Sequence, residues 1–165
     1  MTTTANLPII TMYGAASVGK TSLISVWKGE RLPSPEEAPV FQVRLPSGHP
    51  VLIRVVMVPS FGITLTDHVS KADIAFVVAD LTNESSFFTA ERVITALGPE
   101  TKVISILNKV DQGIYSVDAG FINEIIVHSH ETFLTSTIDN TCTTYPLASL
   151  VDLLTNVYTG SPPAN

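Results

Sequence analysis

The chain has 165 residues, a hydrophobic content of 45%, a charged content of 15% and a formal net charge of −6. This composition predicts one globular domain over residues 1–165 and argues against a disordered chain. The acidic balance disfavours nucleic acid as a partner, because nucleic-acid binding depends largely on lysine and arginine.

Targeting signals are missing from the printed sequence. Residues 1–7 have neither a basic start nor a long apolar stretch, and the longest apolar runs are shorter than a membrane span. A lone cysteine, Cys142, allows no intramolecular disulfide and fits a reducing compartment. The last residues include no cysteine for prenylation, and Thr2 excludes myristoylation. We therefore expect a cytoplasmic protein with no covalent membrane anchor.

The first half of the chain predicts a strand, a helix and a hairpin. Apolar residues 8–13 predict a buried strand, and residues 20–28 suit a helix that ends near Gly29. Residues 30–39 hold three prolines and predict a loop. Two β-rich runs, 40–45 and 51–58, flank a turn that contains proline and glycine, which predicts a hairpin. A loop or short helix follows as far as residue 71.

The second half alternates between strands and helices. Residues 73–80, 101–107 and 132–135 predict strands. Three helices are predicted by apolar residues at helical spacing: Phe87, Ala90, Ile94 and Leu97; Phe121, Ile122, Ile125 and Ile126; and Leu147, Leu150, Val151, Leu154 and Val157. Apolar strands that alternate with amphipathic helices predict an α/β fold, in which helices cover both faces of a parallel sheet.

A phosphate-binding motif follows the first predicted strand. Residues 14–21 read G-A-A-S-V-G-K-T and match the P-loop pattern G-x-x-x-x-G-K-[ST]. Its glycines let backbone N–H groups surround phosphate oxygens, Lys20 supplies a cation, and Thr21 supplies a hydroxyl for Mg²⁺. The motif lies between a predicted strand and a predicted helix, which is the context it needs. An incidental glycine-rich turn is the alternative.

A second motif offers a site for the base. Residues 108–111, N-K-V-D, follow the strand 101–107 directly, about 90 residues after the phosphate motif. The Asp111 carboxylate can accept two N–H bonds from guanine, from N1 and N2, which adenine does not offer in that arrangement. The Asn108 amide can bridge to N7 and to the phosphate loop. The alternative is an ordinary polar turn.

These two motifs make the chain resemble the Ras superfamily of small GTPases, with a Rab-like or Ras-like character. Residues 72–87, A-D-I-A-F-V-V-A-D-L-T-N-E-S-S-F, are similar to the family's fourth strand and the turn after it. The resemblance extends over about residues 7–158 and leaves short flexible tails. It implies a P-loop NTPase fold of the small G domain type. Such a fold has a six-stranded, mostly parallel sheet flanked by helices, in which only the hairpin's first strand is antiparallel.

The resemblance also implies which residues bind GTP or GDP. Thr135-Ser136-Thr137 lies where the family has an S-A-K loop, whose backbone N–H contacts the guanine O6, although Ile138 takes the approximate place of the lysine. Lys109 is expected to pack along the ribose, and Thr21 is the expected metal ligand. The nucleotide-binding residues that we expect are Gly14, Ala16, Ser17, Val18, Gly19, Lys20, Thr21, Gly62, Asn108, Lys109, Asp111, Ser136 and Thr137.

Three departures from the family pattern concern catalysis. The family's D-x-x-G reads P-S-F-G at residues 59–62, so an aspartate that orders the magnesium water shell is replaced by Pro59. The residue after Gly62, where many members have a water-orienting glutamine, is Ile63. The loop 30–39 contains no threonine, and Ser34 is its only hydroxyl. No catalytic residue is therefore assigned, and Mg²⁺ is expected to be held weakly if it is held at all.

The sequence favours a guanine-nucleotide-binding protein with impaired or very slow GTP hydrolysis that acts through protein partners. Two alternatives stay open. One is a nucleotide-free pseudo-GTPase that serves as a scaffold or as a subunit of a complex. The other is an active GTPase that recruits residues from a partner.

Overall fold

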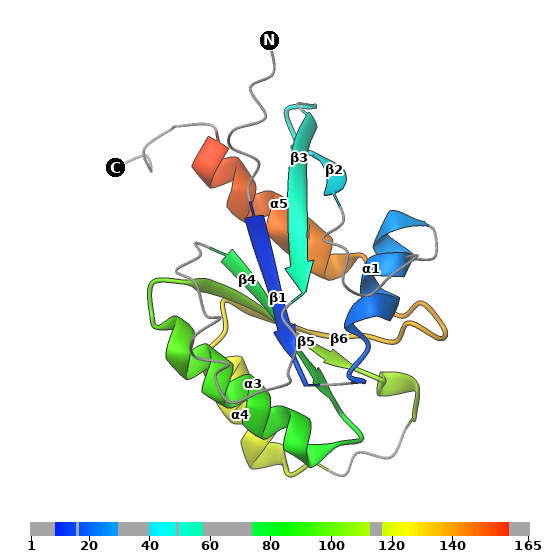
Figure 1. Cartoon of the computed structure of the whole chain (residues 1–165), viewed down its shortest axis with the longest axis vertical. Coiled ribbons are helices and arrows are strands. Elements are labelled where there is room, and N and C mark those ends of the chain that lie inside the picture. The colour runs from blue at the N-terminus through cyan, green and yellow to red at the C-terminus, as the bar shows by residue number, and fades with distance from the viewer. Residues whose placement is uncertain are drawn as a thin grey trace.

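A six-stranded sheet forms the centre of the structure, a computed structural model that describes residues 9–15, 17–29, 40–48, 50–57, 74–112 and 117–158. The strands lie in the order β2-β3-β1-β4-β5-β6 (Figure 1). Their bounds are β1 Ile9–Gly14, β2 Val40–Arg44, β3 Pro50–Met57, β4 Ile74–Asp80, β5 Lys102–Asn108 and β6 Glu131–Leu134. Only β2 runs antiparallel to its neighbour, so the fold is α/β with a mostly parallel sheet.

Helices cover the sheet on both faces. The helices are α1 Lys20–Lys28, α3 Glu84–Leu97, α4 Ala119–Val127 and α5 Tyr145–Tyr158, together with the short 3₁₀ helix η2 Val110–Gln112. Side chains of α1 and α5 share one hydrophobic cluster, and those of α3 and α4 share a second. Figure 1 shows α3 and α4 side by side, with α1 and α5 across the sheet from them.

The strand β4 shows why the sheet is buried between two helical layers. All seven of its residues are buried. Phe76 and Val78 pack with α1 and α5, whereas Val77 and Ala79 pack with α3 and α4. Successive side chains of a strand point to opposite faces, so a strand covered on both sides is apolar throughout.

Local signals set the helix ends close to where the sequence predicts them. The helix α1 has the predicted bounds and ends at Gly29, whose φ of 76° suits a residue without a side chain. Asn83 caps α3 by accepting a hydrogen bond from the Ser85 N–H, and Asp118 caps α4 in the same way through the Gly120 N–H. The predicted hairpin is confirmed, because Val43 pairs with Val51 in antiparallel register.

The structure adds which apolar residues of two predicted helices are buried. The helix predicted from Phe121, Ile122, Ile125 and Ile126 is present as α4, where Ile125 is buried and Ile126 is 48% exposed. In α5 the buried face includes Leu153, which the predicted spacing omits. None of the helices in the described part of the chain has the length and apolar character needed to cross a bilayer. The predicted loops 30–39 and 59–71, with Gly62, lie outside the described residues.

Candidate functional site

The carboxyl ends of three neighbouring strands bring the two sequence motifs together. Gly14 ends β1, Asp80 ends β4 and Asn108 ends β5. Gly14 pairs with Val78, and Asp80 pairs with Asn108, so the three ends form one edge of the sheet. In open α/β sheets this edge is where ligands bind. Sequence spacing predicts the motifs, and the parallel register explains why they meet.

The loop between β1 and α1 depends on two glycines. A side-chain carbon added to Gly14 would lie 2.6 Å from the Val78 carbonyl oxygen. One added to Gly19 would lie 2.2 Å from Nδ2 of Asn108, and Gly19 also has a φ of 106°. Both distances are shorter than any normal contact, so the loop folds this way only with glycine at both positions. Ala16, also predicted to bind phosphate, lies outside the described residues.

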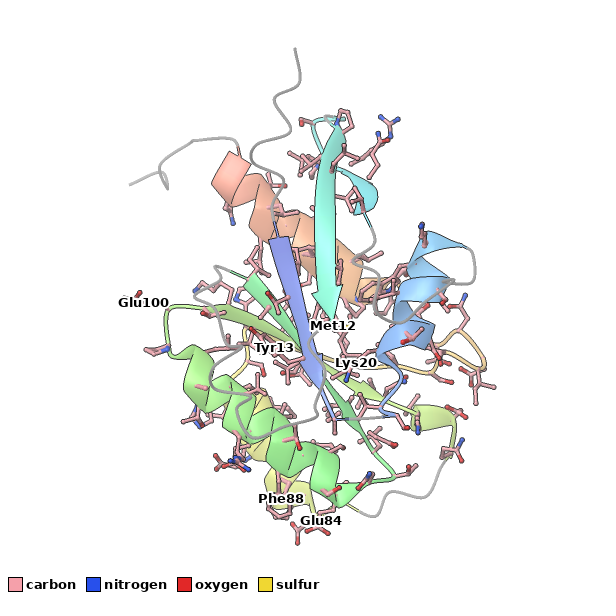
Figure 2. The ribbon with its side chains drawn as sticks, in the orientation of Figure 1. Met12, Tyr13, Lys20, Glu84, Phe88 and Glu100 are labelled. Atoms are coloured by element: carbon pink, nitrogen blue, oxygen red, sulfur yellow. The ribbon has the colours of Figure 1, made fainter. Side chains whose placement is uncertain are left out.

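Lys20 begins α1 and bends back over the loop. Its ammonium donates hydrogen bonds to the carbonyl oxygens of Gly14 and, at 3.0 Å, Ala15. Figure 2 shows Lys20 at the start of α1, next to the end of β1. Burial lowers the pKa of Lys20 from 10.5 to about 8. Two neutral carbonyls do not replace an anion, and this makes the ammonium a good partner for phosphate.

Asn108 holds the two motifs in fixed relation. Its side chain is 1% exposed, and its amide nitrogen donates to the carbonyl oxygen of Val18 at 3.0 Å. Its amide oxygen accepts a hydrogen bond from the hydroxyl of Thr135, also at 3.0 Å. One side chain thus joins the loop between β1 and α1, the end of β5 and the segment after β6. A buried amide that is hydrogen-bonded through both its nitrogen and its oxygen favours a single arrangement of the site.

Lys109 follows β5 and pairs with Asp80 at the end of the neighbouring strand β4. The ammonium of Lys109 lies 2.8 Å from a carboxylate oxygen of Asp80. The other oxygen of Asp80 accepts hydrogen bonds from the backbone N–H and the hydroxyl of Thr82, at 2.8 and 2.6 Å. Burial alone raises the pKa of Asp80, but the bonds from Lys109 and Thr82 and the charge of Lys109 outweigh it and lower the pKa below 3.8.

Sequence reasoning did not assign Asp80 to the site. An acidic residue at the carboxyl end of a buried strand, two residues before a threonine, is the signal that could have found it. Lys109 has a φ of 69°, an uncommon value for a residue with a side chain.

Asp111 occupies the other end of the site. One of its carboxylate oxygens accepts a hydrogen bond from the Ser136 hydroxyl at 2.7 Å, and the other accepts one from Nε2 of Gln112 at 3.2 Å. The Ser136 hydroxyl accepts in turn from the N–H of Asp139 at 3.3 Å. The hydrogen bond from Ser136 therefore orients the carboxylate of Asp111.

A cavity of about 550 Å³ connects these groups. This volume lies within the range of small-molecule sites, which is roughly 300–1,000 Å³. The predicted residues that line it are Ser17, Gly19, Lys20, Thr21, Asn108, Lys109, Asp111 and Thr137, joined by Ser22, Thr82, Gln112 and Ile138, which the sequence did not assign. The predicted residues Gly14, Val18 and Ser136 are not among the lining residues but bond to three that are: Gly14 accepts from Lys20, Val18 accepts from Asn108, and Ser136 donates to Asp111.

The predicted metal ligand, Thr21, lines the cavity. A threonine hydroxyl supplies one oxygen, and Mg²⁺ would need its other ligands from phosphate oxygens and water. The residues that the structure describes contain no cluster of three or more acidic, histidine or cysteine side chains that could hold a metal ion.

Three residues outside the cavity have other surroundings. Trp27 lies with its ring centroid 5.1 Å from that of Phe76 and donates from Nε1 to the Thr143 carbonyl oxygen at 2.6 Å. His128 and His130 follow α4, which ends at Val127. Each histidine lies near a different glutamate: His128 is 3.4 Å from Glu124, and His130 is 3.9 Å from Glu131.

Comparison with models of known protein families gives no match to this chain, and comparison with curated proteins gives no significant match.

Proposed function

We propose that this chain binds a guanine nucleotide in the cavity between α1 and the loops after β5 and β6. The observation that carries the proposal is the hydrogen bond from Asn108 to the Val18 carbonyl oxygen. It joins a phosphate-binding motif and a base-binding motif across one cavity of about 550 Å³. Each motif alone has a trivial explanation, but a shared cavity is what a nucleotide requires.

The phosphate end of the proposed site is formed by Lys20 and the start of α1. The N-terminus of a helix carries a partial positive charge and unpaired N–H groups, which favour an anion. Lys20 adds a full positive charge beside the cavity. A bound phosphate would compete with the carbonyl oxygens of Gly14 and Ala15 for this ammonium.

The base end is formed by Asp111 and Thr137. Guanine presents N1–H and N2–H₂ on one edge, and a carboxylate can accept both. Adenine has no such pair of donors on that edge. Both oxygens of Asp111 already accept hydrogen bonds, from Ser136 and Gln112. An oxygen has two lone pairs, so the bond from Ser136 is compatible with base binding.

Hydrolysis of a bound nucleotide is proposed to be very slow. In GTPases a glutamine orients the attacking water and Mg²⁺ neutralises charge on the phosphates. This sequence has Ile63 in place of the glutamine and Pro59 in place of the aspartate that orders the water shell of Mg²⁺. It also has no threonine within residues 30–39. The protein would then act through protein partners as a nucleotide-bound module, with GDP or GTP serving mainly to stabilise its fold.

A nucleotide-free scaffold is the second candidate, and one observation favours it. Lys20 is hydrogen-bonded to carbonyl oxygens of the chain's own loop. The loop therefore has internal partners without a ligand. Under this alternative the same fold would serve as an interaction platform, and its cavity would stay empty.

The test begins with the protein as purified. Native mass spectrometry and absorbance near 260 nm would reveal a retained nucleotide, and calorimetry with GDP, GTP and ATP, with and without Mg²⁺, would measure affinity. We expect guanine nucleotides to bind more tightly than ATP, with only a modest effect of Mg²⁺. Lys20→Ala should lose binding, whereas Lys28→Ala at the far end of α1 should not. Absence of guanine-nucleotide binding at millimolar concentration would favour the scaffold.

A further inference from the structure

We infer that Asp80 is a positioning residue: by pairing with Lys109, it determines that the free positive charge of the cavity lies at the Lys20 end. This inference rests on the proposed nucleotide site. Three charged side chains are among the described residues that line the cavity, namely Lys20, Lys109 and Asp111. Two of them are cations, so on charge alone a phosphate has two places to bind. The pairing of Lys109 with Asp80 removes one of them.

The geometry of Asp80 suits this role. It is 4% exposed, ends β4 and is fixed by its own backbone, because its N–H donates to the Ser86 hydroxyl at 2.9 Å and its carbonyl oxygen accepts from the Asn83 N–H at 3.0 Å. Its carboxylate is further held by Thr82. The carboxylate that receives the Lys109 ammonium is thus rigid, and a fixed acceptor needs little reorganisation to hold its partner.

Lys109 is held by this contact in one direction. Its ammonium is drawn toward the strand end, at 2.8 Å from the Asp80 carboxylate, while its residue still lines the cavity. Its charge is thereby compensated. Lys20, by contrast, donates to two neutral carbonyl oxygens, and none of the residues that the structure describes places a carboxylate against its ammonium.

The consequence concerns the orientation of the ligand. With Lys109 neutralised, positive charge is concentrated at the Lys20 end and negative charge at the Asp111 end. A nucleotide then binds with its phosphates at Lys20 and its base at Asp111, and the reverse orientation is disfavoured. Asp80 does this without touching the ligand, since it does not line the cavity.

The test uses a double-mutant cycle with inorganic pyrophosphate and GDP as the two probes. In Asp80→Asn, the amide can still accept from Thr82 but no longer compensates Lys109, so the freed ammonium becomes a second anion site. We expect the affinity for pyrophosphate to rise about tenfold, the change that one charge-assisted hydrogen bond can supply. The preference for GDP over pyrophosphate should fall by a similar factor. In a Lys109→Met background, Asp80→Asn should change neither quantity.

Asp152→Asn is the matched control, because Asp152 is exposed on α5 and its substitution removes the same charge from the protein. It should leave both affinities unchanged. A structural role for Asp80 would lower the melting temperature and weaken both probes alike in both backgrounds, and this result would overturn the inference. Equal pyrophosphate affinity in wild type and Asp80→Asn would overturn it as well.

The outcome for the proposed function is separate. If wild type binds pyrophosphate but no guanine nucleotide, the proposed function fails, and the rise in pyrophosphate affinity still decides the role of Asp80. If wild type binds GDP and Asp80→Asn changes nothing, only the inference about Asp80 fails. If wild type binds neither probe, both are overturned.

Discussion

The side-chain amide of Asn108 donates a hydrogen bond to the main-chain carbonyl oxygen of Val18 at 3.0 Å, across 90 residues of sequence. Because Asn108 also accepts from Thr135, it connects the phosphate loop with the loop that follows β6. These contacts involve a single buried side chain, so the shape of both ends of the cavity depends on it.

Replacement of Asn108 should therefore affect both stability and binding. In Asn108→Ala, the Val18 carbonyl and the Thr135 hydroxyl lose their bonds to this side chain inside the protein. We expect the free energy of unfolding to fall by about 1–3 kcal/mol and guanine-nucleotide binding to be lost. Urea denaturation and calorimetry measure the two effects. Asn123→Ala on the exposed surface of α4 is the control and should change neither.

A substitution at Gly19 tests the close approach to Asn108 separately. Gly19→Ala combines a left-handed backbone, at φ 106°, with a carbon 2.2 Å from the Asn108 nitrogen. Gly29→Ala has a left-handed backbone, at φ 76°, with no atom within 4 Å of the added carbon. The control should cost about 1–2 kcal/mol from the backbone alone, and Gly19→Ala should cost more.

The energetic cost of the close contact between residue 19 and Asn108 can be isolated by combining Gly19→Ala with Asn108→Ala. In the Asn108→Ala background the side chain that obstructs residue 19 is gone, so the added cost of Gly19→Ala should fall to the cost of Gly29→Ala. Thermal or urea denaturation of the four proteins measures this coupling. An equal cost of Gly19→Ala in both backgrounds would contradict the close contact.

Several features of the site follow from sequence, and others depend on the tertiary fold. The fold class, the strand and helix order and the two motifs could be predicted, because apolar periodicity and glycine spacing are local signals. The pairing of Lys109 with Asp80 could not, since it depends on the parallel register that sets Asp80 beside Asn108. The position of a residue in the sequence does not show which strand lies beside its strand in the sheet.

The direction of Lys109 is the clearest example of this limit. The resemblance to small GTPases implies that this lysine packs along the ribose, and its residue does line the cavity. Its charge, however, is directed to Asp80, at 2.8 Å. The surface helix α4 illustrates a second limit, because its apolar composition predicts more burial than Ile126 has, with 48% of its surface exposed. Composition alone does not distinguish an inward from an outward apolar residue.

The pKa of Lys20 predicts how ligand binding depends on pH. Burial lowers this pKa to about 8, and a bound phosphate stabilises the charged form and raises it again. Binding therefore takes up a proton above pH 8. The affinity for GDP should then fall as the pH rises, with a limiting slope of about tenfold per pH unit. Calorimetry in two buffers with different ionisation enthalpies would detect the proton uptake. Lys20→Arg stays charged, and any binding that it retains should lack this dependence.

The same group predicts a pH effect on the stability of the ligand-free protein. Between about pH 8 and the unfolded value of 10.5, the folded protein has released the Lys20 proton, whereas the unfolded chain still holds it. Because the unfolded state then binds more protons, this group's contribution to stability rises with pH in that window. The unfolding free energy of wild type minus that of Lys20→Met should therefore rise between about pH 8 and pH 10.5. A constant difference would contradict the lowered pKa.

The Asp111 carboxylate predicts selectivity between two purines. Inosine diphosphate lacks the 2-amino group of GDP but is otherwise the same. Wild type should prefer GDP by about tenfold, the worth of one hydrogen bond to a charged group. Asp111→Ala should lose this preference. Ser136→Ala removes a donor 2.7 Å from the carboxylate and should reduce the preference in part. Equal preference in wild type and Asp111→Ala would exclude Asp111 as the contact to the base.

Trp27 predicts a spectroscopic signal, because it is the only tryptophan in the chain. Its Nε1–H donates at 2.6 Å to the carbonyl oxygen of Thr143, at the end of the segment that carries Thr137 and Ile138 to the cavity. A ligand that orders this segment changes the environment of the indole. We expect the emission of Trp27 to shift when GDP binds.

Trp27→Phe separates packing from hydrogen bonding at this position. Phenylalanine retains an aromatic ring against Phe76 but has no N–H for the Thr143 carbonyl oxygen. Loss of this bond should lower the unfolding free energy by about 1–3 kcal/mol and weaken GDP binding measured by calorimetry, since the segment beside the base loses its attachment to α1. Phe88→Leu is the control, because it removes the ring contact of Phe88 with Phe121, and neither residue lines the cavity; it should leave GDP affinity unchanged. Unchanged affinity in a less stable Trp27→Phe protein would mean that the bond supports the fold and has no influence on the cavity.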